Sequence, residues 1–471
     1  MDSFIQKIEK DEVLKQIKPF IKDVKAYVVG GFVRDILMGK TSPDRDLIVC
    51  DCDVKQFSKD LANELNGHYI ELDTINNIYR IVLEDKINYI DVTCPIENDL
   101  EKDIKRRDLT INAIAYDLNK SEFIDLVGGI DDIKNKKICS IKDKNFEDDP
   151  LRLIRTFRFY AKTGFAIDKN LIELSKKLCK RINEPAKERV NIELLKLFEG
   201  EYSDLALKEM DNCGLLEELF PIYKEVKKVP KNSHHHLPLI EHLFETVKQI
   251  QLLFSQANEE VKTYLQNKNY GGVEQFAFLK LSAFLHDIGK PSTWTIEEET
   301  GRHRFIKHDD VGSQMVVPIL KEFKFSKKQI EYVKMLIKYH IYPSGLFCSE
   351  EVTDKAIMKF YRKMDGYVID VILLAMADRL SARGEQITDE IVEKNINSLT
   401  KLLKDYLAIK KDMKPLPKLL DGIDIMEILQ IKQGPELGKI INELKEAQIS
   451  GIVNDKQEAI DFIKNNFSIK S

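Results

Sequence analysis

The sequence has no long apolar run, no paired cysteines and no internal repeat. None of its apolar runs approaches the roughly 20 residues that a membrane-spanning helix needs. The first stretch, MDSFIQKIEKDEVLKQIKPF, lacks the apolar centre of a signal peptide. The seven cysteines are scattered without a CxxC pair, and their odd number argues against a disulfide framework. We therefore expect a protein of the reduced cytoplasm with no membrane partner.

Length and charge set the next bounds. At 471 residues the chain exceeds what one hydrophobic core supports, so we expect roughly two to four domains. A composition of 43% hydrophobic and 32% charged residues is typical of a globular protein rich in helices. The net charge of −5 does not indicate a nucleic-acid-binding protein. The 73 Lys and Arg residues can still form a local basic face.

The hydrophobic pattern changes near residue 146. Before it, short β-branched runs such as KAYVVGG, RDLIVCD and INYIDVTC alternate with helical or loop segments. After it, almost every segment has apolar residues at helical spacing, with a break at KVPKNSHHHLP and a connector at KKDMKPLPKL. We predict an α+β multidomain fold with a small head, a helical neck, an all-α domain and a short helical tail. The predicted domains are residues 1–145, 146–227, 228–400 and 401–471.

The stretch VVGGFVRDILMGK predicts a strand, a glycine turn and a helix. Gly30 and Gly31 let the backbone approach an anion, and the amides at a helix start favour phosphate oxygens. Arg34 is spaced to add a charge-assisted bond to the same anion. A plain tight turn is the alternative.

Two aspartates follow on the next predicted strand, DRDLIVC. Residues two apart on a strand point to one face, so Asp44 and Asp46 converge while Arg45 points away. Converging carboxylates repel unless a cation lies between them, and Mg²⁺ is bound by such pairs together with substrate phosphates. A solvated turn before the strand is the alternative. Asp91, in INYIDVTC, is a candidate third catalytic carboxylate, or else an edge-strand residue that caps a neighbour.

Four further blocks follow in order. KRRDLTINAIAYD (105–117) pairs Arg106, Arg107 and Asp108 with a helix that we expect Thr110 to cap. The others are DLVGGIDDIKNKKI (125–138), FEDDPLRLIRTFRF (146–159) and AKERVNIELLKLF (186–198). Together with GGFVRD and DRD, these blocks resemble the class II tRNA nucleotidyltransferase and bacterial poly(A) polymerase family.

The resemblance implies a polymerase-β-like head that holds two Mg²⁺ ions. It also implies transfer of a nucleotide from CTP or ATP to a tRNA 3′ hydroxyl. Asp44 and Asp46 match the family's metal ligands. The positions that match its nucleotide-binding residues are Gly30, Gly31, Arg34, Arg107, Asp108, Asn112, Asp149, Arg152 and Arg155.

The block FEDDPLRLIRTFRF carries the expected choice of base. We expect Asp149, Arg152 and residues 155–156 to lie on one helix face at i, i+3 and i+6 spacing. An aspartate accepts and an arginine donates, so the pair can imitate a complementary base without a template. The alternative is a surface ion-pair ladder. The block departs from the family's usual Glu-Asp, because Asp148 precedes Asp149 here.

Two segments bear on the RNA and on the nucleotides added. Only TCPIENDLEKDIK separates the Asp91 strand from KRRD, which is short for a family member with a long flexible loop. This loop is associated in the family with switching from C to A addition, yet some CCA-adding members are also short here. The basic neck segment 176–189 is a candidate RNA contact.

A second constellation joins His242, His286, Asp287 and Asp378. Two imidazoles and two carboxylates suit a divalent metal with open water positions, such as Ni, Mn, Co, Fe or Mg. The order H…HD…D resembles the HD phosphohydrolase superfamily, which implies an HD domain over roughly 235–385, as a live hydrolase or as a retained scaffold. His308 and His340 are candidates for a second metal or for phosphate, and the runs HHH at 234–236 and HRFIKH at 303–308 are candidate solvated loops.

The alternatives differ in activity. Within the family they are CC-adding, A-adding and poly(A) polymerases. From other classes they are an HD-type phosphohydrolase that acts on RNA ends or nucleotides, and a non-catalytic RNA-binding protein. The tail loop GPELGK can contact RNA phosphates or simply join two packed helices. The oligomeric state does not follow from the sequence.

Overall fold

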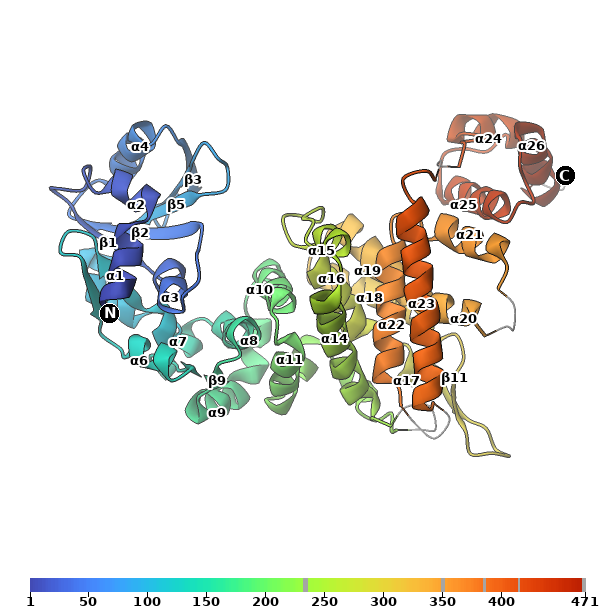
Figure 1. Cartoon of the computed structure of the whole chain (residues 1–471), viewed down its shortest axis with the longest axis horizontal. Coiled ribbons are helices and arrows are strands. Elements are labelled where there is room, and N and C mark those ends of the chain that lie inside the picture. The colour runs from blue at the N-terminus through green and yellow to red at the C-terminus, as the bar shows by residue number, and fades with distance from the viewer. Residues whose placement is uncertain (232–235, 349–351, 384–386, 414–415, 468–471) are drawn as a thin grey trace. The chain divides into compact units, whose positions relative to one another are not determined.

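The computed structural model describes residues 1–231, 236–348, 352–383, 387–413 and 416–467 (Figure 1). The chain divides into two compact units, Met1–Pro221 and Ile222–Ser471. Among the described residues, no helix is long and apolar enough to cross a membrane. His234 and His235, which belong to the candidate HHH loop, lie outside the described residues, and His236 is exposed.

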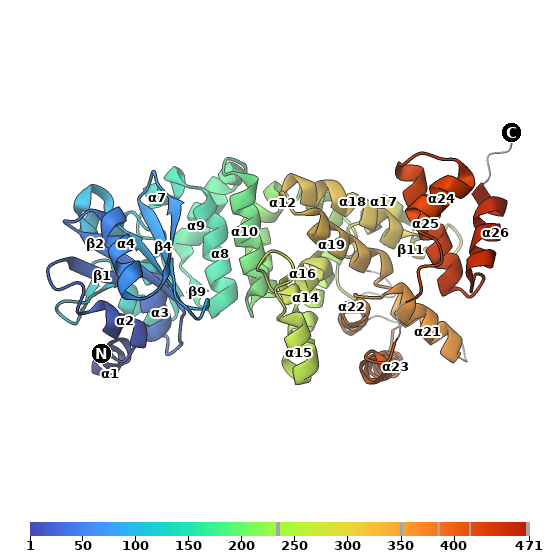
Figure 2. The ribbon, with the colours of Figure 1, turned by 90° about the horizontal axis from the view of Figure 1, so that it is seen from above.

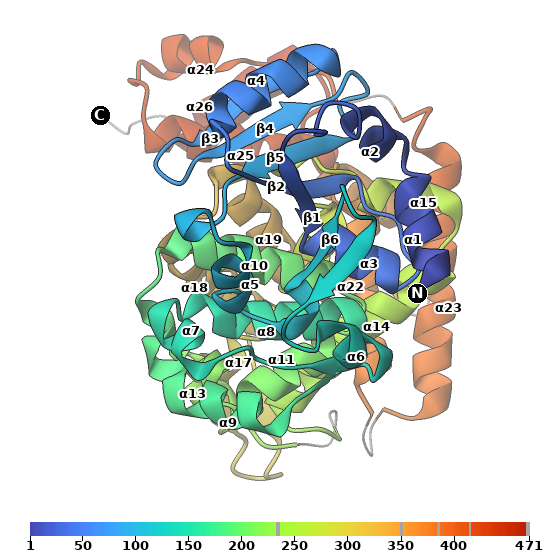
Figure 3. The ribbon, with the colours of Figure 1, turned by 90° about the vertical axis from the view of Figure 1, so that its left-hand side faces the viewer.

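A seven-stranded sheet forms the first part of unit 1, in the order β3-β4-β5-β2-β1-β6-β7 (Figure 3). β2 and β5 are parallel, and the other neighbours are antiparallel. The strands are β1 (Lys25–Val29), β2 (Asp44–Cys50), β3 (His68–Asp73), β4 (Ile78–Val82), β5 (Tyr89–Thr93), β6 (Ile114–Asp117) and β7 (Glu122–Asp125). The apolar centre of β2, Leu47–Val49, is fully buried, which fixes the strand in the middle of the sheet.

Short helices connect these strands. α4 begins at Val54 because the side chain of Asp53 accepts a hydrogen bond from the amide of Gln56. The helices are α1 (Asp2–Glu9), α2 (Glu12–Ile17), α3 (Gly31–Leu37), α4 (Val54–Glu64), α5 (Leu100–Lys105) and α6 (Gly129–Lys134), with 3₁₀ turns η1 (Ile96–Asn98) and η2 (Thr110–Asn112).

The rest of unit 1 is helical, as predicted. α8 packs its apolar face against α10 and α11. The elements are α7 (Asp143–Asp148), α8 (Leu151–Thr163), α9 (Lys169–Leu178), η3 (Cys179–Asn183), α10 (Lys187–Glu199), α11 (Ser203–Asn212) and α12 (Leu215–Leu219). A short parallel pair, β8 (Lys137–Ile138) with β9 (Ala166–Ile167), was not expected from the sequence.

Unit 2 is built around α16, which is apolar on all sides and buried along its whole length. α14, α19 and α22 pack around it (Figure 2). The helices are α13 (Tyr223–Val226), α14 (Leu239–Gln256), α15 (Glu259–Leu265), α16 (Gln275–Leu285), α17 (Lys290–Thr293), α18 (His308–Glu322), α19 (Lys327–Tyr339), α20 (Tyr342–Leu346), α21 (Asp354–Lys363), α22 (Val368–Ser381) and α23 (Asp389–Ile409). Helices α24 (Gly422–Leu429), α25 (Pro435–Ile449) and α26 (Lys456–Phe467) share a core of their own.

Three local expectations were wrong. The predicted helix after Thr110 is the short turn η2, followed directly by the buried strand β6. Asp149 is extended and lies before α8, because Pro150 follows it and disfavours helical backbone at the preceding residue. The predicted all-α domain contains a β hairpin of β10 (Trp294–Ile296) and β11 (His303–Phe305), so most of HRFIKH is not a loop.

Candidate functional site

The turn between β1 and α3 places a glycine against a carboxylate. Gly30 has a positive φ of 70°, which side chains rarely allow. A Cβ atom added to Gly30 would lie 2.9 Å from Oδ2 of Asp46 and 3.2 Å from Nη1 of Arg107. The turn therefore depends on glycine, because any side chain here would enter the space between the two charged groups.

β2 sorts its charged residues onto opposite faces, as predicted. Asp44 and Asp46 share one face, while Arg45 lies buried on the other and its Nη2 is 2.6 Å from Oδ2 of Asp11. Asp46 is opposite Asp91 in the parallel pairing of β2 with β5. One oxygen from each of the three aspartates lies within 4.8 Å of the others.

Asp91 lies in the interior of the sheet, because β5 pairs with both β4 and β2. The edge-strand alternative for this residue was therefore wrong. Its two carboxylate oxygens accept hydrogen bonds from Arg80, each at 2.7 Å. Arg80 thus balances part of the negative charge of the cluster, a partner that the sequence did not point to.

The charged forms of Asp44 and Asp46 are disfavoured in this cluster. Burial, and then the charge of Asp44, raise the pKa of Asp46 to about 6. Burial and the charge of Asp91 raise the pKa of Asp44. Oδ1 of Asp44 is buried without a hydrogen-bond partner in the described structure. Converging, partly orphaned carboxylates are a donor set that fits a divalent cation.

A cavity of about 540 Å³ opens in front of Asp44 and Asp46. It is also lined by cations of α8 and α10 to which the sequence had not pointed: Arg158, Lys162 and Lys196. Arg34 lines the cavity too, but it is buried and donates to Asn112 Oδ1 at 2.6 Å and to Asp35 Oδ1 at 2.8 Å. An anion in this cavity would lie between carboxylate-bound cations and fixed positive side chains.

A second cavity, of about 420 Å³, adjoins the first and shares Arg107, Asn112 and Arg155 with it. The predicted base-reading residues line this cavity, but their pairing differs from the expectation. Asp149 Oδ2 is 2.7 Å from Nη2 of Arg189, and Arg152 Nη1 donates to the backbone oxygen of Arg106 at 2.7 Å. Arg189 comes from α10, about 40 residues away in sequence, and therefore no local spacing could reveal it.

Arg155 holds Asp108. The distance from Nε of Arg155 to Oδ2 of Asp108 is 2.6 Å. Burial alone would raise the pKa of Asp108, yet the charge and hydrogen bond of Arg155 lower it to about 2. Arg155 and Arg158 also pair with the buried Glu193 of α10, at 3.5 and 2.9 Å. The alternative of a surface ion-pair ladder is therefore partly right, because Arg155 and Arg158 form ion pairs that join α8 to α10. Asp149 and Arg152, in contrast, line the cavity.

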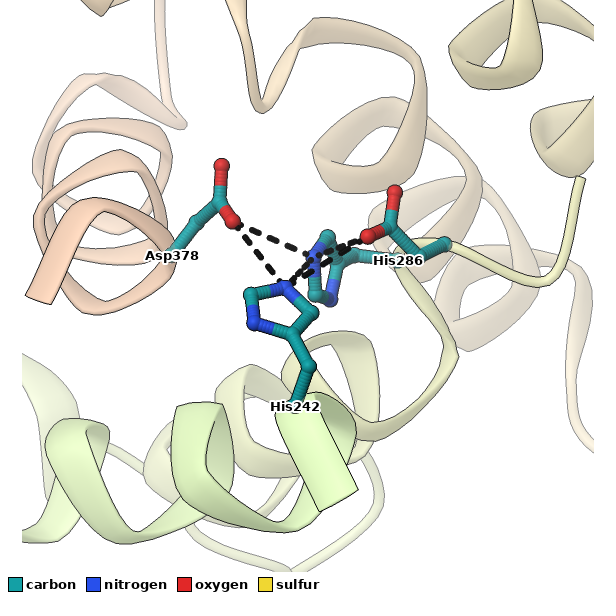
Figure 4. A group of neighbouring side chains, drawn as sticks. His242, His286 and Asp378 are labelled. Carbon is teal, nitrogen blue, oxygen red and sulfur yellow. Dashed lines mark hydrogen bonds and ion pairs between the residues drawn. The ribbon is translucent and has the colours of Figure 1, made fainter. Parts of the chain in front are cut away.

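The histidine–aspartate set assembles in unit 2 as predicted (Figure 4). His242 comes from α14, His286 and Asp287 from the end of α16, and Asp378 from α22. Nε2 of His242 is 3.2 Å from Asp378 Oδ1, and Nε2 of His286 is 3.2 Å from Asp287 Oδ2. Ligands around one ion with bonds of about 2.1 Å are separated by about 3.0–3.4 Å. These four side chains therefore fit a single divalent cation.

Asp287 faces a second group through its other oxygen. Oδ1 is 3.2 Å from Nε2 of His308 and 3.8 Å from Nε2 of His340. The Nδ1 atoms of His286, His308 and His340 lie 2.7–2.8 Å from backbone oxygens, and donation to these oxygens leaves each Nε2 as the ligand atom. His308 therefore belongs to the cluster and is not a solvated loop residue.

The charges of this cluster favour a cation at its centre. Burial alone would lower the pKa of His286, yet Asp287 and Asp378 raise it to about 10. Burial lowers the pKa of His340 to about 4, which keeps this imidazole neutral near pH 7. The carboxylates around His286 thus attract positive charge. The neutral imidazole of His340 offers the lone pair of its Nε2 to a metal ion.

Comparison with known proteins matches both units. The Poly A polymerase head domain matches residues 26–139, the probable RNA and SrmB-binding site of polymerase A matches 164–227, and a tRNA nucleotidyltransferase domain 2 matches 308–463. A CC-adding tRNA nucleotidyltransferase of Thermus thermophilus is 29% identical over 94% of both chains. An A-adding enzyme of Deinococcus radiodurans is 27% identical over 93% of this chain and 95% of its own.

The chain belongs to the class II tRNA nucleotidyltransferase and poly(A) polymerase family. A solved CCA-adding enzyme in complex with CTP has the same fold, with a TM-score of 0.58, 20% identity and coverage of 99% and 98% of the two chains.

The family match leaves part of this tRNA nucleotidyltransferase homologue unassigned. Residues 228–307, which include His242, His286 and Asp287, lie outside the matched segments. The clustering of these side chains is therefore observed in the structure and does not follow from the matched segments.

Proposed function

We propose that this chain transfers CMP and AMP from CTP and ATP to the 3′ end of tRNA, and so builds or repairs the CCA end. The observation that carries this proposal is the aspartate cluster next to the Gly30 turn, in a cavity that Arg158, Lys162 and Lys196 also line. The kinship with CC-adding and A-adding tRNA nucleotidyltransferases supports it. These substrates also imply a cytoplasmic location.

In this proposal, the aspartates of the head bind metal and the cations of the neck bind the triphosphate. Asp44 and Asp46 would hold Mg²⁺, with Asp91 next to them, and the bound metal supplies Lewis-acid activation of the attacking hydroxyl and of the phosphate. The cations across the cavity stabilise the triphosphate and the leaving pyrophosphate. Because Gly30 has no side chain, the space next to Asp46 stays open for the triphosphate.

The adjoining cavity would select the base. Asp149 and Arg152 offer an acceptor and donors there, and Arg189 holds Asp149. Asp108, which is paired with Arg155, accepts a hydrogen bond from Asn112. Arg107 is held by Asp103 and by the backbone oxygen of Asn112. RNA would also contact the basic neck segment and the tail.

The test uses tRNA that lacks its 3′ CCA and each labelled nucleotide separately. Incorporation of both CMP and AMP supports CCA addition. CMP alone indicates a CC-adding enzyme, AMP alone onto CC-ended tRNA an A-adding enzyme, and long A tracts a poly(A) polymerase. Asp44→Ala and Asp46→Ala should abolish incorporation and leave tRNA binding nearly unchanged, and retained turnover in either variant would refute the metal role.

We propose a second function for unit 2, a metal-dependent phosphohydrolase of the HD type. The specific observation is Asp287, whose two oxygens face two separate sets of imidazole Nε2 atoms. Two metal ions on either side of one carboxylate are suited to hydrolysis of a phosphate ester. Mn, Co, Ni, Fe and Mg are all compatible with His and carboxylate ligands.

The test measures phosphate release by the full chain with each of these metals in turn. The Asp44→Ala background removes any contribution from the head. His286→Ala should abolish the activity, while Asn397→Ala, on the exposed surface of α23, should have no effect. No release with any metal would refute this second function and leave the first untouched.

A further inference from the structure

The chain between two proposed metal ligands of unit 2, Asp287 and His308, forms a short helix and a hairpin. α17 leads directly into β10, and β11 ends at Phe305, three residues before His308. Figure 1 shows β11 beside α17. The hairpin is therefore tied to the metal centre at both of its ends.

One face of the hairpin is aromatic. Trp294 pairs with Phe305, and Ile296 pairs with His303, so these four side chains share a face. The rings of Trp294 and His303 lie 5.5 Å apart, centroid to centroid, with a tilt of 32°. Both residues are half-buried, so neither is fully closed off from solvent.

The polar atoms of this pair are not satisfied. Nε1 of Trp294 and Nδ1 of His303 are buried and have no hydrogen-bond partner in the described structure. A buried indole N–H normally finds an acceptor. Because protein atoms enclose both nitrogens, what this pair can offer a ligand is its ring faces, for stacking.

Lys290 connects this face to the metal centre. Its Nζ is 2.6 Å from Asp287 Oδ2 and 5.6 Å from the centroid of the Phe305 ring. Phe305 is directly opposite Trp294, where cross-strand Cβ atoms are about 4.5–5.5 Å apart. A phosphate at Asp287 and a ring on Trp294 can therefore belong to one molecule.

We propose that the Trp294–His303 face binds the nucleobase of a nucleoside phosphate whose phosphate group lies at the metal centre around Asp287. This rests on the phosphohydrolase function proposed for unit 2 and names its substrate class. Stacking on an aromatic ring suits every base. A free nucleotide and a single-stranded RNA end share this chemistry.

Fluorescence tests the site directly, because Trp294 is the one tryptophan of the chain. A nucleotide bound in the head gives no tryptophan signal. AMP with Mg²⁺ should quench the fluorescence saturably, and ribose 5-phosphate should not. The same titration is repeated with the trinucleotide CCA. Tighter binding of AMP indicates a free nucleotide as the ligand, and tighter binding of CCA indicates a single-stranded RNA end. Free tryptophan serves as the optical control, and an unchanged signal with both ligands would overturn the proposal.

Variants separate this site from a structural role of the hairpin. His303→Ala should weaken AMP binding about 5- to 100-fold, as the loss of one stacking partner predicts. Thr295→Ala, on the exposed opposite face of the hairpin, should leave the quenching unchanged. Equal weakening by both variants would contradict a site on the aromatic face.

Turnover separates this inference from the proposed phosphohydrolase. Trp294→Ala should raise the KM for AMP about 5- to 100-fold and should affect the KM for glycerol 2-phosphate, which has no base, far less. Trp294→Phe should restore most of the lost affinity. Equal loss with both esters would overturn the proposal. If neither ester is hydrolysed with any metal, the phosphohydrolase fails, while saturable quenching by AMP still supports the base site.

Discussion

Replacing Gly30 by alanine tests the proposed reaction centre, because the substitution adds a single carbon atom next to Asp46. The backbone at Gly30, with φ 70° and ψ −129°, is unfavourable for any side chain and should cost about 1–3 kcal/mol of folding free energy. The new Cβ would also lie 2.9 Å from Asp46 Oδ2, closer than carbon and oxygen can approach. Either Asp46 or the turn must therefore move.

The expected result is a loss of function larger than the loss of stability. A misplacement of about 1 Å in a metal ligand costs on the order of 10²-fold in rate, so CMP and AMP incorporation should fall by about this factor. Incorporation is measured on tRNA without its CCA end, and stability by thermal unfolding followed by circular dichroism.

Gly39 provides the matched control. It also has a positive φ, of 79°, but a Cβ atom there meets nothing within 4 Å. Gly39→Ala should therefore lose a similar amount of stability and keep its activity. Equal rates in the Gly30→Ala variant and the unmodified enzyme would refute the geometric reasoning, and so would equal loss of activity in both variants.

Three further predictions concern other parts of the molecule. Arg152→Ala should change the ratio of CTP to ATP use more than it changes thermal stability, and an unchanged ratio would count against its role in base selection. The pKa of Asp108 is about 2 in the folded chain against an ordinary 3.8, so its stabilisation of about 2 kcal/mol is present above pH 4 and is lost as the pH falls towards 2. Denaturant unfolding at pH 5 and pH 3 checks this, because Asp108→Asn should lose less stability over that interval. His308→Ala should reduce the metal bound to unit 2 from two ions to one, measured by elemental analysis, and an unchanged content would exclude the second ion.

The local part of the head was predictable from the sequence. Side chains alternate between the two faces of a strand, and this alone predicted that Asp44 and Asp46 share one face and Arg45 lies on the other. The Gly-Gly turn was predicted from its position after an apolar run. The H…HD…D order likewise identified residues that three separate helices bring together.

The partners of these residues were not predictable. Arg80, Arg189 and Glu193 reach the site from other strands and helices, and no spacing rule relates them to Asp91, Asp149 or Arg155. Asp149 left the predicted helix because of Pro150, a signal that was present in the sequence and outweighed the helical spacing.

The triplet Asp44-Arg45-Asp46 serves two purposes at once. Its outer members face the proposed chemistry, whereas Arg45 reaches through the sheet to Asp11, at the start of the second helix of the chain. Because Arg45 and the two aspartates belong to one strand, a change in the N-terminal helices that displaces Arg45 would also displace Asp44 and Asp46, the proposed metal ligands. Variants at Asp11 or Arg45 can therefore behave like active-site variants, although neither side chain faces a substrate.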